Sequence, residues 1–350
     1  DKTKVNTIGV IGPNADSRAA LIGNYHGTSS EYITVLEGIR EEAGDDVRIL
    51  YSQGCDLYKD KVENLAWDQD RISEAVITAE NSDVVILCVG LDETLEGEEG
   101  DTGNSDASGD KVDLHLPKVQ EELIEKVTAV GKPTIVVLMA GSAIDLNYAQ
   151  DNCNGILLAW YPGARGGRAI ADLLFGKESP SGKLPITFYK DLEGMPEFTD
   201  YSMKNRTYRY MEKEALYPFG YGLTYSDTCV TEAEVVGEVS AESDIMLKAT
   251  VKNNGTVDTD EVVQVYIKDL DSPLAVRNYS LCGFKRVSLK AGEEKSVEFT
   301  ISNKAMNIVD EDGNRYIAGK HFRLFAGVSQ PDTRSAELTG HKPAEVEIAL

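Results

Sequence analysis

Residues 84–90, Val-Val-Ile-Leu-Cys-Val-Gly, form an uninterrupted apolar run. A strand buried on both faces, as in a parallel sheet covered by helices, has such a continuous pattern. The same pattern recurs in Thr134–Met139 and Gly155–Trp160. Segments with helical spacing, such as 116–130, lie between these runs. This β-α-β-α order predicts an α/β fold, a sandwich with a mostly parallel sheet, over residues 1–188.

An acidic segment follows the first apolar run: Leu91-Asp-Glu-Thr-Leu-Glu-Gly-Glu-Glu-Gly-Asp101, here called the acidic loop. In open α/β sheets, ligands bind at the carboxyl ends of the strands, where this loop is expected to lie. Carboxyl groups crowded together keep a proton more readily than isolated ones, which suits a proton donor working near neutral pH. The competing interpretation is a solvated surface loop, the usual role of a charged run.

The composition limits the partners. Among 350 residues, 59 acidic against 35 basic side chains give a formal net charge of −24. Such a chain would repel a phosphate backbone or an anionic membrane, so neither nucleic acid nor a membrane is expected as a partner. No apolar run approaches the ~18 residues of a membrane span. The chain starts with Asp1 rather than Met and has no signal-peptide pattern, so a fragment or a processed chain is expected.

The cysteines and histidines favour neither a metal site nor a redox site. The cysteines are Cys55, Cys88, Cys153, Cys229 and Cys282, and the histidines are His26, His115, His321 and His341. They form no Cys-x-x-Cys pair and lack the spacing of metal ligands. We therefore expect no metal and no cofactor. Unpaired cysteines favour a reducing compartment, and with it a cytoplasmic location.

The pattern changes after residue 188. Residues 189–225 are rich in Pro, Gly and Tyr and are expected to form an irregular connector. Short alternating segments follow, among them Glu261–Lys268 and His321–Gly327. Such strands, separated by turns, predict an antiparallel β-sandwich of the immunoglobulin or fibronectin type III kind over residues 226–350.

Other motifs are less informative alone. Tyr161-Pro-Gly-Ala-Arg-Gly-Gly167 precedes a predicted helix but matches neither phosphate-binding glycine motif, so a tight turn is favoured. Ser142 lacks the G-x-S-x-G context of a serine hydrolase. Gly23-Asn-Tyr-His-Gly27 could line a sugar pocket through Tyr25 and His26, or be a surface loop.

Several blocks, in order, resemble the C-terminal half of a glycoside hydrolase family 3 enzyme, the β-glucosidase/β-xylosidase family. The resemblance implies a retaining exo-hydrolase that removes terminal, non-reducing β-D-xylosyl or β-D-glucosyl residues with a pair of carboxyl groups. In that family the nucleophilic Asp lies in a (β/α)8 barrel that precedes the sandwich, and this chain contains no barrel. The blocks are Ile11–Asp16, Ile22–Gly27, Gly90–Glu98, Gly182–Thr187, Tyr217–Gly222 and Gly283–Val287.

The family's acid/base glutamate lies in a pattern like E-[GA]-E-x-x-D-R. Aligned with the acidic loop, this pattern selects Glu98, with Asp101 at the Asp position. Thr102 replaces the usual Arg, so Glu99 and Glu96 remain alternatives. Asn24 and Tyr25, together with Asp101, are the expected substrate-binding residues.

The resemblance also implies the partners, namely a β-linked oligosaccharide or aryl glycoside and the N-terminal barrel, in the same protein or in another chain. The block from Ile22 is more similar to the xylosidase branch, yet xylose and glucose are not distinguished. The sequence leaves open whether the chain forms a homo-oligomer. The alternative function is a non-catalytic carbohydrate-binding or assembly module.

Overall fold

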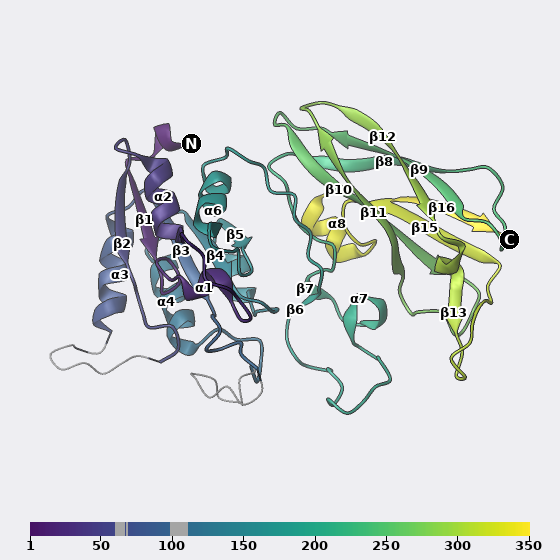
Figure 1. Cartoon of the computed structure of the whole chain (residues 1–350), viewed down its shortest axis with the longest axis horizontal. Helices are drawn as coiled ribbons and strands as arrows, with labels where there is room; N and C mark the ends of the chain where they lie inside the picture. Colours follow the sequence, from purple (N-terminus) through teal and green to yellow (C-terminus); the bar gives the residue numbers. More distant parts are fainter. Residues whose placement is uncertain (60–66, 68, 99–110) are drawn as a thin grey trace. The chain divides into compact units, whose positions relative to one another are not determined.

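The computed structural model describes residues 1–59, 67, 69–98 and 111–350. It forms two compact units, unit 1 (Asp1–Lys177) and unit 2 (Glu178–Leu350) (Figure 1). Unit 1 is an α/β fold and unit 2 consists mainly of antiparallel sheets, so the predicted fold class is confirmed. The division at residues 188 and 225 stays a prediction. Within the described ranges, no helix is both long and apolar enough to span a membrane.

Unit 1 contains a parallel sheet with strand order β2-β1-β3-β4-β5. The two central apolar runs became β3 and β4 with the predicted bounds, because both faces of these strands are buried. The strands are β1 (Thr7–Ile11), β2 (Arg48–Ser52), β3 (Val84–Gly90), β4 (Thr134–Met139) and β5 (Gly155–Leu158).

Helices cover both faces of this sheet (Figure 1). Helices α2 and α6 enclose a core on one face with Ile86 and Cys88 of β3. Helices α3 and α4 lie on the other face, where Leu87 and Leu123 are fully buried. The helical elements of unit 1 are η1 (Lys2–Lys4), α1 (Ala19–Ile22), α2 (Val35–Ala43), α3 (Asp70–Glu80), α4 (Lys118–Thr128), α5 (Asn147–Asn152) and α6 (Gly166–Leu174).

Two glycines let α2 and α6 pack closely. A Cβ on Gly38 would lie 2.2 Å from the carbonyl oxygen of Gly167, and a Cβ on Gly167 would lie 1.9 Å from that of Thr34. Thr34 also begins α2, since its hydroxyl accepts from the Glu37 amide while the Glu37 carboxylate accepts from the Thr34 amide. The α2–α6 contact therefore depends on backbone groups that meet without side chains between them.

Gly38→Ala is accordingly expected to destabilise unit 1 by about 1–3 kcal/mol through overpacking. Helix propensity alone would favour alanine by about 1 kcal/mol, so a net loss isolates the steric effect. Urea unfolding followed by tryptophan fluorescence suits the test, because Trp67 and Trp160 both lie in unit 1. Gly27→Ala is the control, since its added Cβ meets nothing within 4 Å. Equal midpoints for the two variants would contradict the close-contact argument.

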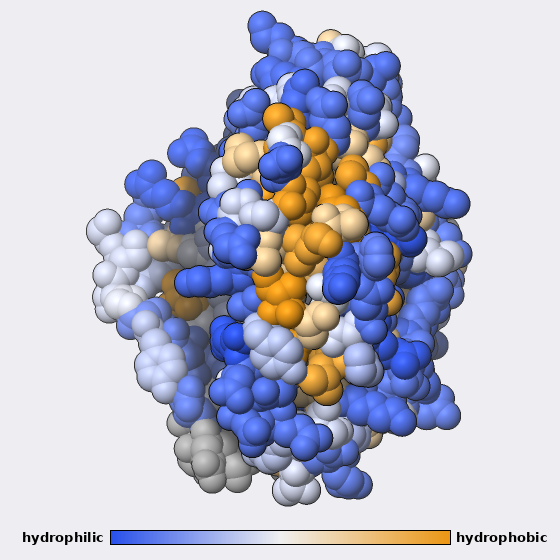
Figure 2. All heavy atoms as spheres, turned by 90° about the vertical axis from the view of Figure 1, so that its right-hand side faces the viewer, coloured by the Kyte–Doolittle hydropathy of each residue, from blue (hydrophilic) through white to orange (hydrophobic). Residues whose placement is uncertain are grey.

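Unit 2 contains a β-sandwich of two antiparallel sheets, ordered β11-β10-β15-β16 and β12-β9-β8. Their inward residues, such as Val265, Phe299 and Phe322, form one core. Figure 2 shows hydrophobic residues gathered in a stripe among hydrophilic ones on the face that it presents. The strands are β8 (Thr228–Val236), β9 (Ile245–Asn253), β10 (Thr259–Asp269), β11 (Ser280–Leu289), β12 (Glu294–Ile301), β15 (His321–Gly327) and β16 (Ala344–Ala349).

The segment before the sandwich belongs to unit 2 and packs on it. The ring of Tyr208 stacks on Phe219 with centroids 4.2 Å apart, and both contact a buried aromatic cluster around Tyr266 and Tyr279. The predicted connector thus contains ordered elements. The smaller elements of unit 2 are β6 (Phe188–Tyr189), α7 (Thr207–Tyr210), β7 (Ala215–Tyr217), η2 (Asn303–Met306), β13 (Asn307–Val309), β14 (Arg315–Ile317) and α8 (Thr333–Thr339).

A buried ion pair joins the Gly182–Thr187 block to the sandwich. Lys183 Nζ lies 2.8 Å from Glu261 Oε1, with 8% and 1% of the two side chains exposed. Lys183 Nζ also donates to the Gly222 carbonyl at 2.6 Å, and Glu261 Oε2 accepts from the Thr228 hydroxyl at 2.5 Å. Each charge is therefore both paired and hydrogen-bonded, as burial of an ion requires.

Candidate active site at the carboxyl edge of the parallel sheet

The acidic loop leaves the carboxyl end of β3, as expected from its position in the sequence. The backbone leaves the strand at Gly90, whose φ is 142°, and a Cβ there would lie 1.9 Å from the carbonyl oxygen of Met139. Only glycine fits such a conformation and such a contact. The next amide, that of Leu91, donates to the same Met139 carbonyl at 2.7 Å. The loop therefore starts beside the end of β4.

The first half of the loop is a hydrogen-bonded turn around Asp92. The Asp92 carboxylate accepts from the amide and the hydroxyl of Thr94 at 2.9 and 2.6 Å. The Asp92 carbonyl accepts from the amides of Leu95 and Glu96. Asn14, which follows β1, donates its side-chain amide to the Leu91 carbonyl at 3.1 Å. These bonds fix the chain up to Glu96.

The Glu96 carboxylate is held by residues that follow β4 and β5. Oε2 accepts from the Gly141 amide and from the Tyr161 hydroxyl, both at 2.6 Å, and Oε1 accepts from the Ser142 hydroxyl. Both oxygens of Glu96 therefore already have partners within unit 1. No role for Ser142 or Tyr161 in holding a carboxylate was expected from the sequence. The available signal was topological, because carboxyl ends of adjacent parallel strands share one edge.

Tyr161 is positioned by close packing and by an unusual backbone. A Cβ on Gly23 would lie 2.6 Å from its ring and one on Gly141 would lie 2.9 Å from it, so two glycines make room for the ring. The preceding residue, Trp160, has φ of 53°, which a bulky residue rarely adopts. Burial, and secondarily the bond to Glu96, raise the pKa of Tyr161. The hydroxyl consequently remains a donor at neutral pH.

The structure separates the predicted catalytic candidates. Glu98 lies two residues beyond Glu96 and is exposed, with no regular secondary structure. Glu99 and Asp101 lie outside the described residues, as does Thr102. Of the described acids of the pattern, Glu96 is partly buried and Glu98 is exposed.

The predicted substrate-binding residues lie after α1. Asn24 donates its side-chain amide to the Glu96 carbonyl at 3.4 Å. Tyr25 is 85% exposed, with φ of 54°. Beside it, His26 Nε2 lies 3.1 Å from Glu93 Oε2, so this segment meets the acidic loop at two points. Within the ranges that the structure describes, no group of three His, Cys, Asp or Glu residues is arranged to hold a metal ion.

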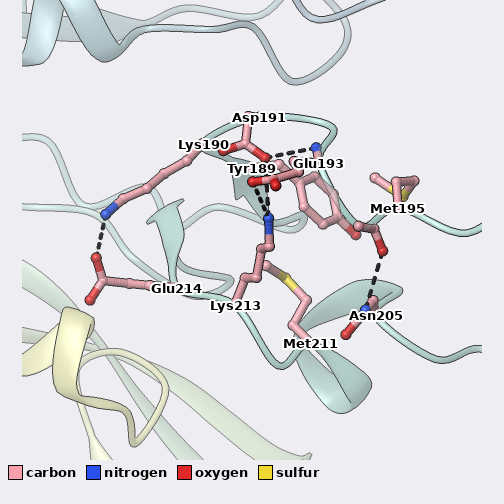
Figure 3. Close-up of a pocket in the computed structure, with 10 residues that line it drawn as sticks. Tyr189, Lys190, Asp191, Glu193, Met195, Asn205, Met211, Lys213 and Glu214 are labelled. Carbon is pink, nitrogen blue, oxygen red and sulfur yellow. Dashed lines mark hydrogen bonds and ion pairs between the residues drawn. The ribbon is translucent and has the colours of Figure 1, made fainter.

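A separate pocket of about 240 Å3 lies in unit 2, between residues 189 and 214 (Figure 3). Its charged groups pair with each other. Lys190 pairs with Glu214, and Lys213 Nζ lies 2.8 Å from Glu193 Oε2 (Figure 3). Tyr189, Met195 and Met211 complete the lining. These pairs neutralise most of the pocket's charge.

Unit 1 thus carries a carboxylate-bearing loop at the edge of its parallel sheet, and unit 2 contains a β-sandwich. The model of the glycosyl hydrolase family 3 C-terminal domain matches residues 2–225, and that of the fibronectin type III-like domain matches residues 261–330. The chain belongs to glycoside hydrolase family 3, as the resemblance implied.

Known relatives agree in sequence and in structure. The chain is 34% identical to a beta-xylosidase of Formosa agariphila, over 97% of this chain and 47% of that protein. It is 39% identical to a xylan 1,4-beta-xylosidase of Xylanibacter ruminicola, over 76% of this chain and 31% of that protein. A β-glucosidase structure from Erythrobacter marinus superposes with a TM-score of 0.83 at 29% identity, covering 100% of this chain and 47% of the other. The chain thus spans at most about half the length of these relatives.

Proposed function

We propose that this chain is the acid/base-bearing portion of a retaining, exo-acting glycoside hydrolase that removes terminal, non-reducing β-D-xylosyl or β-D-glucosyl residues. The nucleophilic Asp is supplied by an N-terminal (β/α)8 barrel, in the same protein or in another chain. The family membership and the names of the relatives support this assignment. The relatives' greater length leaves room for such a barrel.

The observation that carries the assignment of the acid/base is the exposure of Glu98 on the loop that leaves the carboxyl end of β3, the edge of the sheet where ligands bind. The carboxylate of Glu96 is held by Gly141, Ser142 and Tyr161. An acid/base must place an oxygen within hydrogen-bond reach of the glycosidic oxygen. We therefore assign this role to Glu98 rather than to Glu96.

Glu98 has two tasks in the proposed reaction. In the first step its carboxyl group gives a proton to the glycosidic oxygen as the bond from that oxygen to the anomeric carbon breaks and the barrel Asp bonds to this carbon. In the second step its carboxylate takes a proton from water, whose oxygen attacks the anomeric carbon and releases the Asp. Two carboxyl groups about 5–5.5 Å apart suit this retaining course.

Tyr25 is proposed to contact the substrate, because its exposed ring lies in the segment that meets the acidic loop through His26 and Glu93. Roles for Asn24 and Asp101 in binding stay predictions. Xylosides and glucosides are both retained as substrates, since the relatives bear both names.

The function is tested by hydrolysis of aryl β-D-xyloside and β-D-glucoside, with the chain alone and with the chain together with the barrel. We expect turnover only when the barrel is present. Titration of the isolated chain with xylose, glucose and xylobiose tests the alternative, a non-catalytic binding module. Tight sugar binding by the chain alone, without turnover when the barrel is present, would favour that alternative.

A further inference from the structure

We propose that the Gly141 amide and the hydroxyls of Ser142 and Tyr161 form a carboxylate clamp that holds Glu96 and thereby sets the position of Glu98 for proton transfer. This inference rests on the proposed function, in which Glu98 is the acid/base. It makes Glu96 and Tyr161 positioning residues, since neither is required to touch the substrate.

The clamp is built from three strand ends. Glu96 comes from the loop after β3, Gly141 and Ser142 follow β4, and Tyr161 follows β5. The three donors reach both carboxylate oxygens. Hydrogen bonds to a charged acceptor are about twice as strong as neutral ones, so the point of attachment is firm. Only Gly97 separates this fixed residue from Glu98, which limits how far the Glu98 backbone can move.

The same turn also holds the chain beyond the acidic loop. Lys111 Nζ donates to the Ala143 carbonyl at 2.8 Å. Burial lowers the pKa of Lys111, and the nearby Glu96 opposes this shift. Residues 141–143 therefore contact two residues of the chain, Glu96 before Glu98 and Lys111 after it.

The clamp also accounts for the unusual backbone conformation of Trp160. Trp160 adopts its left-handed conformation just before Tyr161, and Gly23 and Gly141 leave space for the Tyr161 ring. Such backbone conformations persist where the surrounding structure stabilises them, and they concentrate at functional sites. At this position the unusual backbone brings the Tyr161 hydroxyl to Glu96.

The test compares Tyr161→Phe, Glu96→Gln and Glu98→Ala in the complete enzyme, this chain together with the barrel. Each variant is assayed with xylobiose, whose leaving group needs protonation, and with 2,4-dinitrophenyl β-D-xyloside, whose leaving group does not. A 1 Å misplacement can cost about 100-fold in rate. We expect Tyr161→Phe to lower kcat/KM for xylobiose by about 10- to 100-fold, while kcat/KM for the activated xyloside falls much less.

Controls separate positioning from folding. Tyr148→Phe removes a tyrosine hydroxyl that pairs with Thr128 on the surface of the same unit, and it should leave both rates unchanged. A merely structural role for Tyr161 would lower both rates equally, together with the thermal midpoint. Ser142→Ala removes a single donor to Glu96, and it tests the clamp if the Glu96→Gln variant does not fold.

The outcomes distinguish the two proposals. If Glu98→Ala does not selectively slow xylobiose hydrolysis, the assignment of the acid/base fails. If Glu98→Ala does so but folded Tyr161→Phe and Ser142→Ala keep the parental ratio of the two kcat/KM values, the clamp is overturned and the function stands. If all of these variants selectively slow the hydrolysis of xylobiose, both the acid/base assignment and the clamp are supported.

Discussion

Glu98→Ala is expected to lower kcat/KM for xylobiose by about 10²–10⁴-fold in the complete enzyme, the usual contribution of general acid–base catalysis. The physical reason is that the departing sugar oxygen then leaves without a proton. A dinitrophenolate needs no proton, so formation of the glycosyl-enzyme from 2,4-dinitrophenyl β-D-xyloside should remain fast. Its hydrolysis should slow, because no base then activates water.

Azide provides the diagnostic measurement. As a small nucleophile that needs no general base, azide is expected to restore turnover of the activated xyloside in Glu98→Ala and to yield a glycosyl azide with retained configuration. Glu121→Ala is the control, since Glu121 lies on α4, keeps 40% of its side chain exposed and pairs with His115 rather than with the acidic loop. Parental rates on xylobiose for Glu98→Ala would reject this residue as the acid.

The second large effect concerns the buried ion pair of unit 2. Lys183→Met is expected to reduce the free energy of unfolding by about 3–5 kcal/mol, because it leaves the Glu261 carboxylate buried without its cation. The Gly222 carbonyl loses its donor as well. Urea unfolding followed by far-ultraviolet circular dichroism would measure the loss.

Two comparisons sharpen this prediction. Lys190→Met breaks a pair with Glu214 whose side chains are 41% and 43% exposed, so it should cost at most about 1 kcal/mol. The double variant Lys183→Met/Glu261→Gln removes both charges and keeps an acceptor for Thr228, so it should be more stable than Lys183→Met alone. Equal losses for Lys183→Met and Lys190→Met would show that burial of the pair has no energetic consequence.

The parts of the fold that local pattern determines were predictable. β3, β4 and β15 have the predicted bounds, since an apolar run buried on both faces or a clear alternation defines each strand. The predicted helix of 116–130 was observed as α4, shorter at both ends, because helix ends depend on capping rather than on periodicity. α2 was not predicted, although Thr34 and Glu37 form a capping box at its start.

The candidate site was predictable only in part. The acidic loop was located because it follows a buried strand, and the resemblance to the family's pattern then selected Glu98, with Glu99 and Glu96 as alternatives. The contacts that hold Glu96 come from Ser142 and Tyr161, 46 and 65 residues away in the chain. Local pattern does not contain such contacts. They follow from the order of strands β3-β4-β5, which the structure supplies.

The stacking of Tyr208 on Phe219 has a practical consequence for recombinant fragments of this protein. A fragment cut at residue 226 would lose both rings and expose Tyr266 and Tyr279 to water. It would also lose Lys183 while retaining the buried carboxylate of Glu261. A fragment that begins at Glu178, where unit 2 begins, keeps all of these contacts for crystallisation or immunisation.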